Sequence, residues 1–158
     1  MRQLLIIVAL VFAHAAWSGD YEDGVAAFQR NDDSTALVKF RRAAEQGSAA
    51  AQDKLGVMYA YGHGVAQDYK EAVRWYRLAA KSGFNNAQHN LGFMYSNGRG
   101  VVQDYVRAHM WFNIAAVNGD NMSVENRDIV ARKMTPQQIE QAQRMARECM
   151  ASNFKKCD

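Results

Sequence analysis

The sequence contains few of the residues from which metal centres are built. Only two cysteines and four histidines occur in 158 residues. Cys149 and Cys157 do not form a Cys-x-x-Cys pair, and no histidine stands near them. Zinc sites usually show closely spaced Cys and His ligands. We therefore expect no metal site and no cofactor.

Catalytic signatures are lacking as well. The sequence has no His-Glu-x-x-His, no Gly-x-Ser-x-Gly and no phosphate-binding loop. Ser152 and Lys155 match Ser-x-x-Lys, the nucleophile motif of penicillin-recognising enzymes, but no Ser-Asp-Asn or Lys-Thr-Gly completes it. We interpret this match as chance and predict that the protein is not an enzyme. A hydrolase of that type remains the catalytic alternative.

The charge balance gives no argument for nucleic acid. The formal net charge is +3, and the Lys and Arg residues are scattered along the sequence. After residue 18 no apolar run is long enough to span a bilayer, which takes about 20 residues. We therefore expect neither a nucleic-acid partner nor stable insertion into a membrane.

The first 18 residues have the pattern of a secretory signal peptide. An apolar run over Leu4–Ala13 leads into small residues, with cleavage sites predicted after Ala15 or after Ser18. An uncleaved membrane anchor is the alternative, but the run is short for a spanning helix. We expect residues 19–158 to form one domain that is periplasmic or secreted.

The rest of the chain is organised around a unit of 36 residues that occurs twice. Residues 47–82 and 83–118 are identical at 17 of 36 aligned positions. A fixed period of this length indicates a stacked helical array. Each unit is expected to contain two helices joined by a Gly-x-Gly loop, with Gly62 ending the first helix and Asp68 capping the second.

Apolar residues at helical spacing define the faces that should be buried. The small residue Gly56 should let helices approach closely, and Trp75 and Tyr76 should fill the remaining space. A single helix pair cannot bury such stripes alone, so neighbouring pairs must stack. The predicted stripes are Ala51, Leu55, Met58 and Tyr59 in the first helix and Ala72, Trp75, Tyr76, Ala79 and Ala80 in the second.

The repeated pattern A-Q-x-x-L-G-x-M-Y-x-x-G-x-G-V-x-Q-D-Y-x-x-A-x-x-W-Y/F-x-x-A-A resembles the Sel1-like repeat, a relative of the tetratricopeptide repeat. This resemblance implies an all-α fold, a right-handed α-solenoid of stacked antiparallel helix pairs with a C-terminal capping helix. It also implies a non-catalytic scaffold or adaptor that binds a protein or peptide. The specific function depends on the variable positions.

The two ends of the array depart from the pattern. Residues 19–46 are predicted to form an atypical opening repeat with a short turn, in which the second helix fits the pattern and the first fits poorly. Residues 119–158 are predicted to form a degenerate helix followed by a capping helix. Arg127 and Asp128 stand where the repeat has a core Leu and Gly, so the register must slip or the packing must change.

The capping helix has a clear start signal. Thr135 is the expected N-cap, Pro136 takes the first helical position, and Gln138 completes a capping box. In an exported protein, Cys149 and Cys157 would form a disulfide, and the alternative is one buried and one exposed thiol. The expected apolar face of this helix is Ile139, Ala142, Met145, Ala146 and Cys149.

Variable positions on the first helices are the candidate partner contacts. They should lie on the concave face, where aromatic anchors with polar surroundings suit a peptide groove. The alternative for Val57 and Phe93 is packing between repeats, and a second function would be binding of a cell-wall polymer by Tyr61, His89 and Asn97. Because the array is short, homo-oligomers are also compatible with it. The candidate set is Asp53, Val57, Tyr61, His89, Phe93 and Asn97.

Overall fold

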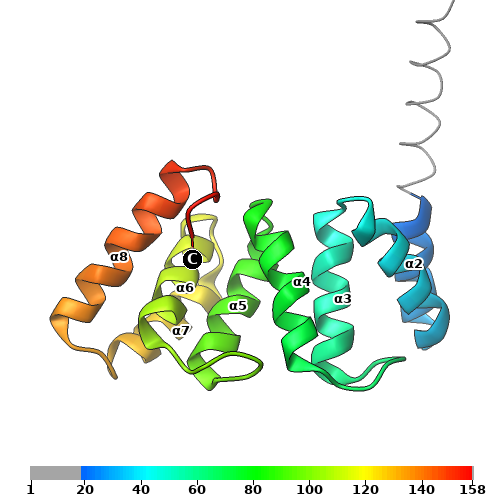
Figure 1. Cartoon of the computed structure of the whole chain (residues 1–158), viewed down its shortest axis with the longest axis horizontal. Helices are drawn as coiled ribbons and strands as arrows, with labels where there is room; N and C mark the ends of the chain where they lie inside the picture. The colour runs from blue at the N-terminus through cyan, green and yellow to red at the C-terminus, as the bar shows by residue number, and fades with distance from the viewer. Residues whose placement is uncertain (1–18, 158) are drawn as a thin grey trace, which may run out of the picture.

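The computed structural model describes residues 19–157 as a row of helices that pack consecutively along the chain (Figure 1). No strand occurs in this part of the chain, so the predicted all-α solenoid is confirmed. The predicted signal peptide lies outside the described residues. A helix over residues 19–29 precedes α2 (Asp33–Glu45), α3 (Ala49–Tyr61), α4 (Tyr69–Lys81), α5 (Asn85–Asn97), α6 (Tyr105–Val117), α7 (Asn121–Ala131) and α8 (Pro136–Ala151).

Local capping chemistry sets the helix boundaries in the two regular repeats. Gly62 ends α3 in the left-handed conformation with a φ of 74°, which a residue with a side chain rarely adopts. The carboxylate of Asp68 begins α4 by accepting hydrogen bonds from the backbone amides of Lys70 and Glu71, at 2.8 and 3.1 Å. Both capping roles predicted from the sequence are confirmed.

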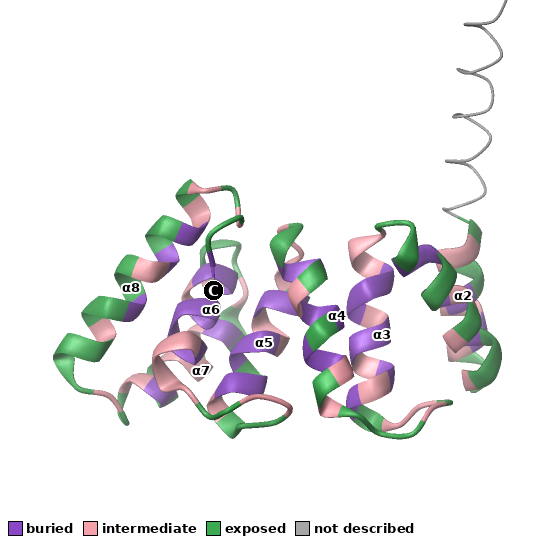
Figure 2. Cartoon of the chain, in the orientation of Figure 1, coloured by how far each residue is buried: buried purple, intermediate pink, exposed green. Residues whose placement is uncertain are grey.

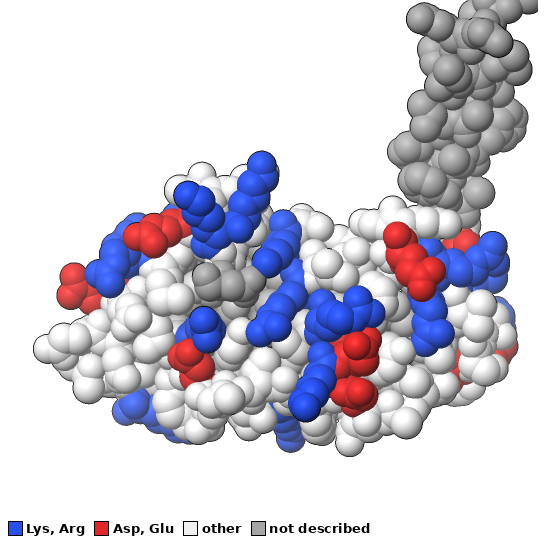
Figure 3. Space-filling model, in the orientation of Figure 1, with Lys and Arg blue, Asp and Glu red and all other residues white. Residues whose placement is uncertain are grey.

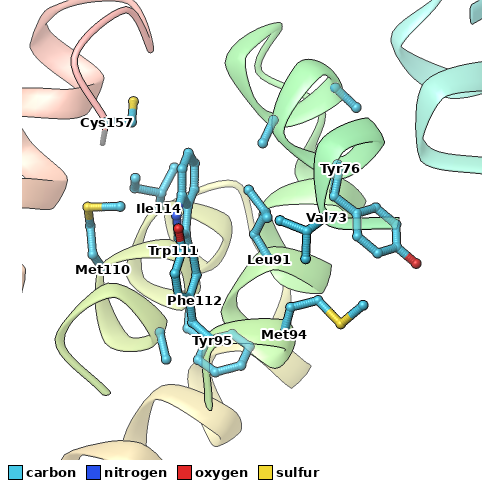
Figure 4. Packing of buried hydrophobic residues seen from close by; sticks show 14 of the residues in the cluster. Val73, Tyr76, Leu91, Met94, Tyr95, Met110, Trp111, Phe112, Ile114 and Cys157 are labelled. Carbon is cyan, nitrogen blue, oxygen red and sulfur yellow. The ribbon is translucent and has the colours of Figure 1, made fainter. Parts of the chain in front are cut away.

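The predicted stripes form the core between the helices. Leu55, Met58 and Ala51 of α3 are buried, whereas Tyr59 is only partly buried. All five predicted positions of α4 are buried. The buried positions run along the interior of the row, and side chains from α4, α5 and α6 converge there with Cys157 of the C-terminal tail (Figures 2 and 4).

A helical glycine pressed against an aromatic ring recurs in each repeat. A Cβ atom added to Gly92 would lie 2.6 Å from the ring of Phe112, and one added to Gly56 would clash with the ring of Tyr76. These contacts confirm that the glycines allow the two helices of a pair to approach closely. Gly24 makes the same contact with Phe40, at 2.7 Å.

The first helix of the opening repeat keeps this glycine contact, although the exposed Asp23 stands where the next repeat has the buried Leu55. Gly24 precedes Gly56 by 32 residues rather than 36 because the turn between the two helices is four residues shorter. Asn31 takes a φ of 58° in this turn, and Asp32 caps α2 by accepting from the amide of Thr35. The turn is therefore different, while the contact between the glycine and the aromatic ring is kept.

Repeated polar residues connect each repeat to the one before it. A buried glutamine of the first helix donates to a carbonyl near the end of the preceding helix, and the same carbonyl also accepts from a backbone amide of the turn that follows. A tyrosine of the first helix accepts from an arginine of the preceding helix. The pairs are Gln52 with Ala44, Gln88 with Ala80, Arg41 with Tyr59 and Arg77 with Tyr95.

The second glycine of each loop serves a contact between repeats. Gly100 lies directly against the backbone carbonyl of Tyr69, at the start of α4, and an added Cβ would overlap that oxygen. Gly64 makes the equivalent contact with Asp33, at the start of α2, where the added Cβ would lie 2.6 Å from the carbonyl oxygen. Each Gly-x-Gly loop therefore docks on the preceding repeat.

In helix α7 some core positions of the repeat stay buried at the expected spacing, while others lie toward the surface. Ser123 and Val130, one period after the buried Ala87 and Met94, are buried as well. Arg127 and Asp128 lie toward the surface, where the guanidinium of Arg127 pairs with the carboxylate of Asp128 at 2.9 Å. The charged residues are accommodated because this part of α7 is not covered by another repeat.

Helix α8 closes the array, as predicted. Its capping box is formed, with Pro136 in the first turn. The helix packs on α6 and buries Ala142, Ala146 and Cys149, while its outer side is exposed (Figure 2). Cys149 is joined to Cys157 by a disulfide, so the tail returns to the body. Within residues 19–157 the structure has no helix with the length and hydropathy needed to cross a bilayer.

We predict that Gly92→Ala destabilises the fold by about 1–3 kcal/mol, since the new methyl group must displace a packed ring. In a helix interior alanine is normally more stabilising than glycine, so a loss of stability on this substitution indicates that the glycine is needed for packing. Chemical unfolding monitored by circular dichroism measures it. Gly19→Ala is the control because an added Cβ there meets no atom within 4 Å. Equal or greater stability of the Gly92 variant would contradict the packing role.

We predict that replacing both Cys149 and Cys157 with Ser lowers the free energy of unfolding by about 2 kcal/mol, the scale for a disulfide that closes a short loop. Intact mass before and after reduction, with thiol alkylation, measures whether the bond is present. A protein from an oxidising compartment that takes up two alkyl groups without reduction would refute the bond.

Candidate binding groove

Three adjoining hollows lie beside α5, between it and the neighbouring helices. The first and second share Asn90, and the second and third share Phe93, and we call the three together the groove. The first, which we call the Asp53 hollow, has a volume of about 300 Å³ and is lined by Asp53, Lys54, Val57, Asn86, His89, Asn90, Asp120 and Met122. The second is small and includes Tyr61, Tyr69 and Arg99, and the third has about 190 Å³ and includes Asn97, Tyr105, Ile129 and Lys133.

The groove contains all six candidate contact residues from the sequence. Asp53, Val57 and His89 line the first hollow, Tyr61 lines the second, and Asn97 lines the third. The helical spacing that defined the set therefore places its members along one surface. Their exposure differs, and this decides what each can do.

The apolar members of the set divide into exposed side chains and a side chain that packs against the core. Tyr61 is 65% exposed and Phe93 is 37% exposed, and the guanidinium of Arg99 stacks on the Phe93 ring at 5.4 Å. Val57 is half-buried and packs against the core, which corresponds to the alternative of packing between repeats. The side-chain amide of Asn97 donates to the carbonyl of Phe93, so it is held against its own helix.

Asp53 is a buried carboxylate at the Asp53 hollow. It is only 3% exposed, and its Oδ1 accepts a hydrogen bond from the side-chain amide of Asn90 at 3.0 Å. Burial raises the pKa of Asp53 to about 6, against smaller opposing effects of the Asn90 hydrogen bond and the Lys54 charge. No ion pair reaches this carboxylate from within residues 19–157.

His89 connects α5 to the start of α7. Its Nδ1 lies 3.0 Å from Oδ2 of Asp120 and 2.8 Å from Oγ of Ser123, and Ser123 also donates to Asp120. Burial by itself would raise the pKa of Asp120, but the hydrogen bond from Ser123 and the contact with His89 together hold it below the usual value. Both carboxylate oxygens of Asp120 are therefore already hydrogen-bonded within the protein.

The three residues His89, Asp120 and Ser123 do not form a catalytic triad. A triad requires the Ser and the acid on opposite ring nitrogens of the His, whereas both contact Nδ1 here. Ser123 is also fully buried.

Ser152, the serine of the Ser-x-x-Lys match, has its hydroxyl engaged within the protein. The hydroxyl donates to the carbonyl of Cys149 and accepts from the amide of Lys156.

No cluster of metal-ligand side chains is present among residues 19–157. The histidines in this region lie apart: His63 is near Asp33, and His109 is buried in α6. The residues suggested for a polymer ligand, Tyr61, His89 and Asn97, line three different hollows. They do not converge on a single pocket for a small ligand.

Several groove residues were not among the sequence candidates. Asn90, Met122 and Ile129 line the hollows, and the latter two are 63% and 45% exposed. The repeat period could have identified Asp120 as the N-cap of α7. It lies 36 residues after Phe84, the N-cap of α5, and 72 residues after Ser48, the N-cap of α3. Its contact with His89 depends on how α7 packs and could not be inferred.

Positive residues gather on the outer side of α4, although they look scattered in the sequence. Lys70, Arg74, Arg77 and Lys81 follow one another at helical spacing, and Lys and Arg form a band over this region (Figure 3). Arg74 pairs with Glu71 at 3.0 Å, and Arg77 donates to Tyr95. The side chains of Arg74 and Arg77 are thus already engaged within the protein.

We predict that Asp53→Asn stabilises the protein at pH 7.5 by about 1–3 kcal/mol, because it removes a buried charge and keeps the partner of Asn90. The pKa of Asp53 is raised in the folded state, so its favourable contribution is complete below about pH 4 and is lost as pH rises through 6. The stabilities of the two proteins should therefore converge near pH 4. Urea unfolding at pH 4, 5, 6 and 7.5 measures this.

The exposed Asp128 provides the control for that comparison. Asp128→Asn should change the free energy of unfolding by less than about 0.5 kcal/mol at all four pH values. If wild type and Asp53→Asn instead gave parallel curves from pH 4 to 7.5, the inferred pKa of Asp53 would be wrong.

Comparisons with a family model and with solved structures all find similarity to Sel1 repeat proteins. The family model of the Sel1 repeat matches residues 15–48, 49–84 and 85–120. The crystal structure of c5321, a protective antigen present in uropathogenic Escherichia coli strains that displays an SLR fold, has 34% sequence identity and a TM-score of 0.82, and the match covers 87% of this chain. This chain spans only 31% of that protein.

A Sel1 repeat protein from Oxalobacter formigenes is similar along nearly its whole length. Its crystal structure has 32% sequence identity and a TM-score of 0.67, and the match covers 81% of this chain and 98% of the other. Comparison with curated proteins gave no match. Because the three repeat matches together cover more than half of the sequence, the chain belongs to the Sel1 repeat family.

Proposed function

We propose that this protein is a non-catalytic adaptor that binds a segment of another protein in the groove along α5. The observation that carries this proposal is the row of exposed apolar side chains in adjoining hollows. Tyr61 from α3, Phe93 from α5, and Met122 and Ile129 from α7 all lie there. Interfaces are commonly anchored by such aromatic and aliphatic groups within polar surroundings.

The fold favours a protein segment as the ligand. A stacked array presents an extended surface rather than a closed pocket, and Sel1 repeats form a scaffold commonly used for protein interaction. The hollows adjoin one another and share lining residues, which suits a chain whose side chains enter more than one hollow.

We further propose that the protein acts in the periplasm or outside the cell. The support is the signal-peptide pattern of residues 1–18 together with a cysteine pair suited to an oxidising compartment. Fractionation of cells that express the full chain with a C-terminal tag tests this. Recovery of an unprocessed protein in the cytoplasm would contradict it.

We predict that Phe93→Asp combined with Tyr61→Ser reduces capture of the partner at least tenfold, because both anchors are lost. The full chain with a C-terminal tag would be purified from envelope extracts with its bound proteins, which are quantified by mass spectrometry. Both positions are exposed, so the fold should survive, and circular dichroism checks this. Val57 is left unchanged because it packs against the core.

Leu78→Asp is the matched control for this experiment. Leu78 is 41% exposed, similar to Phe93, but it lies on α4 and lines none of the three hollows. A protein that is lost from the groove variant and retained by the Leu78 variant is the expected result. Equal retention by both variants would place the interaction elsewhere and overturn the proposed site.

A further inference from the structure

The Asp53 hollow carries a net negative charge with one carboxylate left uncompensated. Asp53 and Asp120 face Lys54 there, so two negative charges stand against one positive charge when both acids are ionised. Asp120 is occupied by Ser123, His89 and the backbone amide of Met122. Asp53 accepts one hydrogen bond, from Asn90, although a carboxylate can accept about four.

A buried carboxylate with one hydrogen bond and no ion pair lowers the stability of the fold, and packing alone gives no reason to retain it. Buried charges are normally paired, because desolvation of an unpaired charge costs several kcal/mol. The groups around Asp53 do not supply a cation at short range: Tyr21 and Tyr76 stand near it from the neighbouring helices, and the Lys54 charge acts only weakly. The carboxylate is nonetheless placed at a hollow of about 300 Å³.

Resting on the proposed adaptor function, we infer that the Asp53 hollow recognises a lysine or arginine side chain of the bound segment. The cationic group would pair with the carboxylate of Asp53 beside the amides of Asn86 and Asn90. Its aliphatic stem would lie against Val57 and Met122, as the stems of long cationic side chains do on apolar surfaces. The neighbouring residues of the segment would contact Phe93 and Tyr61.

The same arrangement makes binding dependent on pH. A cation binds the ionised form of Asp53, and this form is depleted in the free protein below about pH 6. Affinity should therefore be constant above pH 7 and fall by up to tenfold per unit below pH 6. The other titratable groups near Asp53 are Tyr21, Lys54 of α3, Tyr76 of α4, His89 of α5 and Asp120 of α7.

Of these groups, His89 also carries an ionisable ring and lines the same hollow. A control variant must therefore separate His89 from Asp53. His89→Gln removes the ionisable ring and keeps the carboxylate of Asp53. As a lining residue its loss can change the affinity for every peptide, but the fall in affinity below pH 6 should remain. Asp53→Asn keeps the shape of the side chain and removes its charge, so it should abolish both the affinity for the cation and its pH dependence.

The test uses four capped tripeptides of sequence Phe-X-Leu, in which X is Lys, Arg, norleucine or Glu. Binding is followed by ¹H–¹⁵N NMR titration of the purified protein at pH 7.5 and pH 5. The Lys and Arg peptides should shift the amide signals of residues 53–57 and 86–90 saturably and at least tenfold more tightly than the norleucine peptide. This preference should disappear in Asp53→Asn and persist in His89→Gln.

Three results would overturn the inference. They are equal binding of the Lys and norleucine peptides, unchanged binding to Asp53→Asn, and preference for the Glu peptide, which would assign the hollow to an anion held by Lys54. None of these results affects capture of a partner by the anchors Phe93 and Tyr61. If Asp53→Asn captures the envelope partner as wild type does, the adaptor function stands without the cation site.

Discussion

The contact between a helical glycine and an aromatic ring is the constraint on which the architecture depends. Gly56 against Tyr76 and Gly92 against Phe112 fix how closely the two helices of each pair approach. Alanine-rich stripes can then interlock, so that Ala51, Ala72 and Ala79 are completely buried. Because a pair packed in this way still exposes an apolar side, the next pair must stack on it, and the solenoid follows.

The connections between repeats are made at the starts and ends of their helices. Gln52 and Gln88 bind carbonyls near the ends of the preceding helices, and Gly64 and Gly100 dock loops on the starts of those helices. These contacts determine the angle between successive repeats and thereby the groove along α5. Structural requirements thus account for most of the repeated residues, and the positions between them remain available for binding.

The groove combines features that serve different ends. The exposed side chains of Tyr61 and Phe93 provide apolar contact area and have little effect on the stability of the unbound protein. Asp53 has the opposite character, since its burial destabilises the free protein above pH 6. A charged group retained at such a cost fits the general pattern in which functional sites carry local instability that the rest of the fold tolerates.

The sequence by itself determined the helices, their caps, the repeat and most of the core, because these depend on local chemistry and on periodicity. Asp68, Gly62 and the capping box at Thr135 act within a few residues, and Trp75 and Leu55 are marked by their spacing. The same periodicity selected the six candidate residues, which all reached one groove. The sequence could not separate exposed Phe93 from half-buried Val57, since both occupy the same position of the repeat.

Only the tertiary structure decided which polar groups meet. The burial of Asp53 and its bond to Asn90 depend on how α5 stacks on α3, and the contact of His89 with Asp120 depends on the packing of α7. The retained register of α7 despite Arg127 and Asp128 likewise arises from the end of the array. The contacts of Asp53 and His89 join residues 31–37 positions apart through the stacking geometry, which no local pattern encodes.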